Sequence, residues 1–535
     1  MFSCPSCAGK MYFDIQSQKL KCSHCGSQTA VEDYRLNNDA EQHAEDDMTI
    51  YTCRNCGAQL VSPDQSAVAF CSYCGSEQIL EEKLNEYQRP AKIIPFQVTK
   101  NQCRRQYEDI LKKSFYAPKE FRDPQFMERF RGIYIPYWHY EGGFAEGPVA
   151  AKGYATYNRG DYTYNEKYDL KADLKGSWHS MCYDGSSSFD DTIAETIAPY
   201  KAGSFKEFNT GYLAGFYADT ADVPPEKYEN DVLRHAAELG EESIKRAYRN
   251  RNITPSLPDN EKKLQKLLKP EIRRTGPYLV PVWFLTWRKN DRVAYAVVNG
   301  ESGKITSDLP VDARRFFAVT LLCAAILFCP LTLFVSMTAP TALFLSAFIA
   351  WIVSWIYRRE IMHLHDHENH IFDRGYFIDE RPGEISGEKA EKIRKRRYNL
   401  SALGAVAAGL FIVLIMMMVF LDYGDYPPAE KAQLGCTFLL LPAFWNLLRA
   451  LTFVRHMKDR TYVAEALSCF AGIVAALWVL YSDPVYDWWY YLGCLVCLGG
   501  VIITCFGLIR RYNLLSTRAV PELFARRGGI DNAEE

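Results

Sequence analysis

The sequence lacks the motifs that mark the common enzyme classes. It contains neither a P-loop nor a G-x-G-x-x-G segment, and its serine-rich stretch GSSSFDD is not the G-x-S-x-G turn of a hydrolase. His139, His179 and Cys182 have side chains capable of chemistry, but they lie in aromatic-rich segments typical of packed strands. We therefore assign no catalytic or cofactor-binding residue and expect that the protein is not an enzyme.

Positive charge is scarce near the N-terminus. From Met1 to Pro90 there are 7 Lys and Arg against 13 Asp and Glu, a net charge of −6. Nucleic acids bind basic surfaces, so this balance argues against a nucleic-acid partner and favours a protein-binding or architectural role. The stretch Met1 to Lys10 also lacks the basic start and apolar core of a secretory signal. We expect this part of the chain to stay in the cytosol.

Eight of the 17 cysteines form four C-x-x-C pairs, and one pattern of two pairs occurs twice. The first set is Cys4, Cys7, Cys22 and Cys25, and the second is Cys53, Cys56, Cys71 and Cys74. In both sets 14 residues separate the pairs. Two facing C-x-x-C turns supply the four thiolates that tetrahedral zinc requires, and such pairs in a cytosolic chain indicate metal. We predict two structural Zn²⁺ ions, because four thiolates leave no position for water.

Each set is predicted to lie in a zinc ribbon, the first at 1–35 and the second at 50–85. Gly26, Gly57 and Gly75 follow the second cysteine of their pairs, where a positive φ lets backbone N–H groups point at sulfur. The Ala-Gly sequence after Cys7 is the one deviation. Between the pairs the chain has a strand–turn–strand pattern. A redox role is the alternative, but a thioredoxin-like pair would need a βαβ context that is missing.

The segment 90–312 has the mixed pattern of a soluble α+β domain. Apolar residues recur at helical spacing in three stretches, 103–115, 230–250 and 259–268. The buried face of the second helix should contain Val232, Ala236, Leu239 and Ile244. A further short helix should begin at Ser188 or Asp190.

Aromatic and β-branched residues predict the strands of this domain. The predicted strands are FRGIYIPYWHYEGG, two strands joined by an NRGD turn, YLVPVWFLTW, and RVAYAVVNGESGKIT with its Asn-Gly turn. The proline inside the first of them is typical of an edge strand or a bulge.

The chain changes character beyond Asp312. Hydrophobic residues make up 48% of the sequence, yet the mean hydropathy is −0.21, because the apolar runs are confined to the C-terminal part. These runs are about twenty residues long, which is enough to cross a bilayer. Within 313–512 about six spans fit: Phe316–Met337, Thr341–Tyr357, Leu400–Leu421, Leu434–Val454, Val463–Tyr481 and Trp488–Ile509. Residues 513–535 would follow as a tail.

Loop charges predict the orientation of the spans. Arginine pairs at 314–315, 358–359 and 510–511 and the RKRR run at 394–397 fall on one side, whereas the loops on the other side hold one Lys. Because positive loops remain cytosolic, we expect a multi-pass protein of the bacterial cell membrane. Its two termini and its ribbons would then face the cytosol.

A His-rich and basic loop at 358–398 joins the second and third predicted spans. If the second span continues as a helix, His363, His367 and His370 would share one face and could hold a metal ion. A solvated helix extension and a pH-sensitive segment are the alternatives.

Charged groups are few inside the predicted spans, which weakens the case for an ion or proton path. Arg449, near the end of the fourth span, is the main exception. Cys494 and Cys497 in the sixth span also have C-x-x-C spacing, but the glycines beside them favour helix packing over metal binding.

Several motifs occur in the order seen in one group of bacterial proteins. They are the doubled ribbon, IIPFQVTK, GIYIPYWHY, IAPYKAGSFKEFNTGYLAGFYAD, and LVPVWFLTW followed by VNGESGKITSDLPV. Over residues 1–312 the chain resembles TFIIB-type zinc-ribbon membrane proteins, some of which are labelled PriA-like or replication proteins. Some members are encoded beside phage-shock-type and SPFH-domain proteins, so the resemblance implies recruitment of partners at a stressed membrane. The long multi-spanning C-terminal part departs from shorter members.

The sequence therefore predicts a multidomain protein with two N-terminal zinc ribbons, a soluble α+β domain and a C-terminal all-α transmembrane bundle. Its expected role is that of a cytosol-facing scaffold or adaptor that contacts membrane lipids and binds protein partners. The alternatives are a transporter or channel-like protein and a membrane-tethered nucleic-acid-binding protein.

Overall fold

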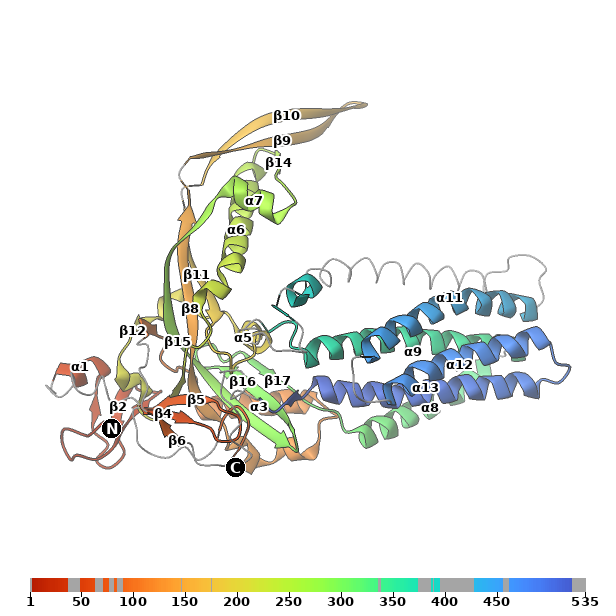
Figure 1. Ribbon diagram of the computed structural model, residues 1–535, viewed down its shortest axis with the longest axis horizontal. Coiled ribbons are helices and arrows are strands. Elements are labelled where there is room, and N and C mark those ends of the chain that lie inside the picture. The colour runs from red at the N-terminus through yellow and green to blue at the C-terminus, as the bar shows by residue number, and fades with distance from the viewer. Residues whose placement is uncertain are drawn as a thin grey trace.

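The protein has two unlike parts in the computed structural model: a sheet-rich soluble part and a bundle of long apolar helices (Figure 1). The structure describes residues 2–36, 49–62, 71–76, 81–83, 90–145, 147–174, 176–334, 338–373, 386–387, 389–394, 428–455 and 461–521. Both four-cysteine clusters lie in the soluble part. This arrangement confirms the predicted fold class.

A 12-stranded sheet forms the centre of the soluble part. Its strands are β4 (Thr49–Thr52), β5 (Gln59–Ser62), β6 (Glu81–Lys83), β7 (Lys92–Ile93), β8 (Arg131–Phe144), β11 (Ser177–Asp184), β12 (Lys206–Glu207), β13 (Tyr217–Asp219), β15 (Pro270–Lys289), β16 (Arg292–Asn299), β17 (Ile305–Ser307) and β18 (Arg518–Ala519). The main path runs β12-β7-β15-β8-β13-β5-β4-β6, with β11 beside β8 and β16 beside β15. The long antiparallel pair β8 and β15 is rich in Val, Ile, Tyr and Trp, which pack well on a pleated surface.

Strand β8 lies in the interior of this sheet, so the edge-strand interpretation of its proline is wrong. The register shifts beside β8 lie opposite residues 140–142, so the bulge interpretation is not confirmed at Pro136 either. On one side β8 pairs with β15 throughout, and on the other it pairs first with β13, up to Tyr134, and then with β11, from Tyr137. Pro136 falls between these two partners, and its carbonyl accepts a hydrogen bond from the N–H of Gly185. The missing N–H of proline therefore interrupts no ladder.

The helices of the soluble part are α1 (Val31–Leu36), α3 (Lys100–Lys113), α4 (Pro124–Met127), α5 (Asp191–Ile197), α6 (Glu229–Arg249) and α7 (Glu261–Leu268). The three longer predicted helices are confirmed as α3, α6 and α7. Asp190 caps α5 as predicted, because its side chain accepts the N–H of Thr192.

The buried face of α6 differs in part from the predicted one. Val232, Ala236 and Ile244 are buried as predicted, but Leu239 is 47% exposed, and Ala237 and Gly240 are buried instead. A side chain on Gly240 would meet the ring of Phe144 at 2.9 Å. Because Gly240 has no side chain, α6 can pack closely against Phe144, and the buried face of the helix therefore includes position 240.

A second, three-stranded sheet projects from the soluble part (Figure 1). It consists of β9 (Pro148–Arg159), β10 (Tyr162–Asp173) and β14 (Thr254–Ser256). Gly160 lies in the two-residue turn between β9 and β10 with φ +62°, which confirms the predicted NRGD turn.

The helical part contains α8 (Ala313–Phe334), α9 (Ala339–Glu368), α11 (Pro428–Val454), α12 (Thr461–Ser482) and α13 (Trp488–Leu515). Four of them, α9, α11, α12 and α13, are long and apolar enough to cross a membrane. Helix α8 occupies the first predicted span, and the third, Leu400–Leu421, lies outside the described residues. The chain is thus a membrane protein, and the count of six spans stays a prediction.

Specific hydrogen bonds join the soluble part to the helices. Arg292 on β16 donates to Glu368 at the end of α9 at 2.9 Å and to the carbonyl of Thr517 after α13 at 2.7 Å. Asn513 on α13 exchanges two hydrogen bonds with the backbone of Val311, at 2.7 and 3.0 Å. The strand β18, which follows α13, adds to the edge of β16.

Candidate metal centres

The first four-cysteine cluster sits on a small three-stranded sheet made of β1 (Met11–Asp14), β2 (Lys19–Cys22) and β3 (Gln28–Thr29). The sulfur atoms of Cys4 and Cys25 are 3.6 Å apart, those of Cys7 and Cys22 are 3.5 Å apart, and all four lie within 4.8 Å of one another. A tetrahedron with metal–sulfur bonds of about 2.3 Å has sulfur–sulfur edges of about 3.8 Å. The four thiols could therefore hold one metal ion.

The turns of both clusters have the predicted backbone conformation. Gly26, Gly57 and Gly75 have φ between +67° and +78°, and Ala8 takes the same role in the remaining turn with φ +54°. The glycine next to it, Gly9, is needed for space, since a Cβ there would lie within 3.3 Å of two of the cluster's sulfur atoms. The deviation in the sequence thus leaves the geometry of the site intact.

The second cluster has nearly the same dimensions but is buried completely. Its sulfur pairs, Cys53 with Cys74 and Cys56 with Cys71, are both 3.7 Å apart. The hairpin of β4 and β5 that supplies the first two cysteines belongs to the main sheet, because Val61 of β5 pairs with β13. This cluster is therefore part of the core of the soluble domain.

The second turn of this cluster, residues 71–76, is held by side chains from the main sheet. The hydroxyl of Tyr73 donates to Asp219 at 2.6 Å, while Thr286 and Tyr295 donate to the backbone carbonyls of Ser72 and Tyr73. These bonds tie the second cysteine turn to β13, β15 and β16.

The first ribbon is more exposed but is also attached to the domain. Cys7 and Cys25 are exposed, whereas Cys4 and Cys22 are buried. The N–H of Phe13 donates to Ala214 at 2.9 Å, and Gln18 donates to the carbonyl of Phe96 at 2.7 Å. Neither ribbon is a separate module on a linker.

Two of the three residues that were considered for chemistry, His139 and Cys182, pack in or against the core. The ring of His139 is buried and stacks on Tyr278 at 4.5 Å. Cys182 lies opposite His139 on β11, and burial raises the pKa of its thiol to about 12, which keeps it uncharged. The side chain of His179 lies outside the described residues.

The proposed histidine face is wrong. Helix α9 ends at Glu368, and His370 beyond it has φ +50°, so His370 cannot continue the helical face of His363 and His367. Instead, His370 lies beside Asp373 and Asp190.

An ion pair inside the helical part was missed by the sequence analysis. Glu465 lies within the fifth predicted span and forms a salt bridge with Arg511 of α13, which is 0% exposed. The hydroxyl of Tyr357 on α9 accepts a hydrogen bond from Arg511 at 2.8 Å, and its ring lies 4.0 Å from the guanidinium carbon. The acidic residue in an apolar run was the available signal, but its partner follows 46 residues later.

The C-x-x-C pair in α13 has a packing role. The thiol of Cys497 donates to the carbonyl of Gly472 on α12 at 3.1 Å, and a side chain on Gly472 would lie 3.0 Å from the Cα of Cys497. Small residues let α12 and α13 approach closely here, as expected.

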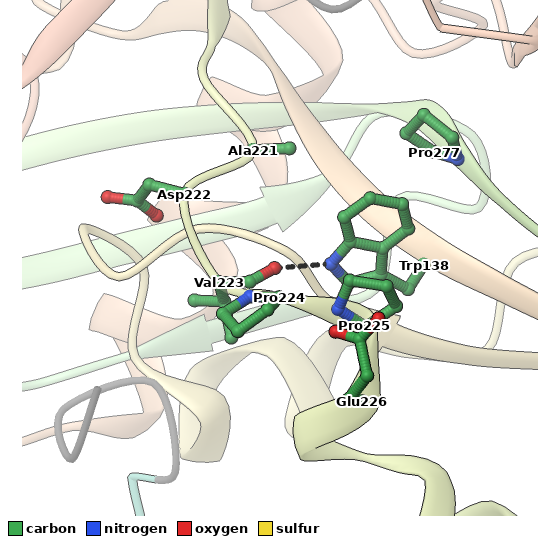
Figure 2. A pocket seen from close by; sticks show the side chains of 8 residues that line it. All are labelled: Trp138, Ala221, Asp222, Val223, Pro224, Pro225, Glu226 and Pro277. Carbon is green, nitrogen blue, oxygen red and sulfur yellow. Dashed lines mark hydrogen bonds between the residues drawn. The ribbon is translucent and has the colours of Figure 1, made fainter.

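A pocket of about 570 Å³ opens between β8 and the segment 221–226 (Figure 2). Trp138 lies in it and donates from its indole N–H to the carbonyl of Val223 at 2.7 Å. The rest of the lining consists of Ala221, Asp222, Pro224, Pro225, Glu226 and Pro277. This lining offers flat apolar surface and two carboxylates, but it contains no thiol, imidazole or hydroxyl side chain.

A similar protein is found in Bacillus subtilis (strain 168), where it is described as "Uncharacterized protein YdjG". It is 30% identical to this chain over 323 residues, which make up 59% of this chain and 92% of the relative. No family model matches the chain. No solved structure matches it either.

Proposed function

The chain belongs to the family of the Bacillus subtilis protein YdjG, and we propose that it is a membrane-bound adaptor. Two Zn²⁺ ions rigidify its soluble part, which faces the cytosol and binds protein partners. The order of motifs that resembles TFIIB-type zinc-ribbon proteins supports SPFH-domain or phage-shock-type proteins as partners.

One observation supports this proposal more than any other: both four-cysteine clusters lie in a soluble part that is itself fastened to the apolar helices. Each cluster has its four ligands from cysteine, so a bound ion would have no position for water and would act structurally. Arg292 bonds the domain to the ends of α9 and α13 at once. Such a rigid, tethered surface is suited to present partners to the membrane.

The cytosolic orientation is supported by the position of the basic residues. Arg358 and Arg359 lie in the C-terminal half of α9, Arg455 follows α11, and Arg510 lies near the C-terminus of α13. The C-terminal ends of these helices point toward the soluble part (Figure 1). The opposite ends carry Asp483 and Asp487 between α12 and α13. By the positive-inside rule, this distribution of charge supports a cytosolic location of the soluble part.

A labelling experiment tests this orientation. Val485 lies in the loop between α12 and α13 and is exposed, so we expect a Val485→Cys variant to react with a membrane-impermeant maleimide in intact cells. The control is Tyr162→Cys at the exposed tip of the β9–β10 hairpin, which should react only after permeabilisation. The reverse pattern would show that the soluble part faces outward.

The adaptor role is tested by comparing co-purified proteins. We expect Cys7→Ser/Cys25→Ser, which opens the exposed first ribbon, to lose most of the partners that the wild-type protein retains after gentle solubilisation, measured by quantitative mass spectrometry. Cys494→Ser, which changes a thiol in α13, is the matched control and should retain them. An unchanged set of partners in a ribbon variant that has lost its zinc would refute the role.

Transport is the second candidate, and the buried pair of Glu465 and Arg511 favours it, since ionisable groups inside membrane proteins often line substrate paths. Substrate flux in reconstituted vesicles distinguishes the two functions. Flux that disappears in Glu465→Gln while partner binding persists would favour the transporter.

A further inference from the structure

Three potential metal ligands meet where the soluble part contacts the end of α9. They are Asp190, which caps α5, and His370 and Asp373, which follow the last turn of α9. One ligand atom from each lies within 4.8 Å of those from the other two. The cluster thus joins two segments that are 180 residues apart in the chain and belong to different parts of the fold.

Backbone hydrogen bonds fix the loop that carries two of these ligands. The N–H of His370 donates to His367 at 3.1 Å, that of Ile371 to Asp366 at 2.9 Å, and that of Asp373 to His370 at 3.0 Å. The loop directs Asp373 inward, where it is 4% exposed. A loop shaped in this way holds its ligands before any ion binds, which reduces the entropy lost on binding.

Among the described residues, carboxylates outnumber cationic groups around the cluster. Arg518 forms ion pairs with Asp190 and, at 3.7 Å, with Asp308. A further carboxylate, Asp184, is 3% exposed, and one of its oxygens is buried without a hydrogen-bond partner. Burial and the neighbouring carboxylates, Asp373 among them, raise the pKa of Asp184 well above its usual value. Buried negative charge in this excess is costly unless a cation or a proton compensates it.

We propose that Asp190, His370 and Asp373 bind a divalent transition-metal cation, Zn²⁺ or Mn²⁺, that fastens the end of α9 to the soluble part. One imidazole nitrogen and two carboxylate oxygens form a donor set that these ions accept. The imidazole disfavours Mg²⁺ and Ca²⁺, which take oxygen ligands.

The existing partners of Asp190 are compatible with this role. A carboxylate can accept hydrogen bonds at about four lone-pair positions. Asp190 accepts three such bonds, from the N–H of Thr192, from the hydroxyl of Thr192 and from Arg518. A metal ion can take a remaining position. Arg518 then orients the ligand from outside the coordination sphere, as hydrogen-bond partners of metal ligands commonly do.

Metal stoichiometry of the full-length protein in detergent tests the site, independently of the adaptor function. After equilibration with Zn²⁺, or with Mn²⁺ in protein already loaded with zinc, we expect three metal ions per chain in the wild type. His370→Gln and, as a second variant, Asp373→Asn should hold two. His363→Gln, a histidine of the same segment outside the cluster, should hold three.

A stability measurement separates metal binding from a merely structural role of these residues. Added metal should raise the thermal midpoint of the wild type and of His363→Gln, but not that of His370→Gln. The proposal would be overturned if the wild type held only two ions per chain after equilibration with Zn²⁺ and also after equilibration with Mn²⁺. It would equally be overturned if His370→Gln and Asp373→Asn each held three ions. If His370→Gln is destabilised in the absence of added metal but keeps its third ion, the histidine is structural and the proposal fails as well.

Discussion

Replacement of Cys53 and Cys56 by serine should unfold the soluble part of the protein, whereas replacement of Cys7 and Cys25 should leave most of it folded. The second cluster is buried, and its turns are bonded to three strands of the main sheet. A structural zinc ion contributes about 10–16 kcal/mol to folding, which is comparable to the whole stability of a domain, about 5–15 kcal/mol. The first cluster, by contrast, has two exposed cysteines and its own small sheet.

Zinc analysis combined with limited proteolysis checks this prediction. Each double variant should lose the zinc ion of its own cluster, but only Cys53→Ser/Cys56→Ser should be degraded rapidly in the segment 90–312. Cys323→Ser, an exposed cysteine on α8, is the control and should keep the zinc ions of both four-cysteine clusters. Equal resistance of the two double variants would show that the second cluster does not support the sheet.

The second large effect is expected at the ion pair inside the helical part. Arg511→Met should destabilise the bundle by about 3–5 kcal/mol, because it leaves the carboxylate of Glu465 buried without its partner. The combined variant Arg511→Met/Glu465→Met should recover much of this loss, since replacing both charges by apolar groups of similar size is often neutral.

Unfolding of the purified protein in detergent measures these differences. Arg510→Met serves as the matched control, because the neighbouring Arg510 donates to Thr461 at an exposed position, and its loss should cost about 1 kcal/mol or less. A double variant that is as unstable as Arg511→Met would mean that Glu465 has a second role, for example in a transport path.

Local patterns explain what the sequence could predict. The four-cysteine clusters could be predicted from the C-x-x-C spacing, because the two cysteines of each turn are close along the chain. The NRGD turn and the helix cap at Asp190 also depend only on neighbouring residues, so they could be predicted as well. The joining of the second ribbon to the main sheet depends on the pairing of Val61 with Ala218. No periodicity in either short segment indicates such a partner.

The same reasoning accounts for the errors at the helices. Helical spacing alone placed Leu239 in the buried face of α6, but contact with Phe144 selects Gly240 instead. The histidine prediction extended α9 too far, because the segment has no proline or glycine to stop it. The helix ends at Glu368 with Asn369 as its cap, and this end is what brings His370 to Asp190.

After the last described helix, α13, the chain returns to the soluble part as strand β18. This connection determines the order in which the sheet can be completed during synthesis. Strand β18 pairs with β16 only after α13 has been synthesised, since Arg518 and Ala519 are the partners of Val293 and Arg292. During translation, Arg292 and Val293 of β16 therefore lack their partner on one side until the segment after α13 has emerged, whereas β17 can already pair with the other end of β16. Completion of the main sheet of the soluble part is thereby coupled to synthesis of the helical part.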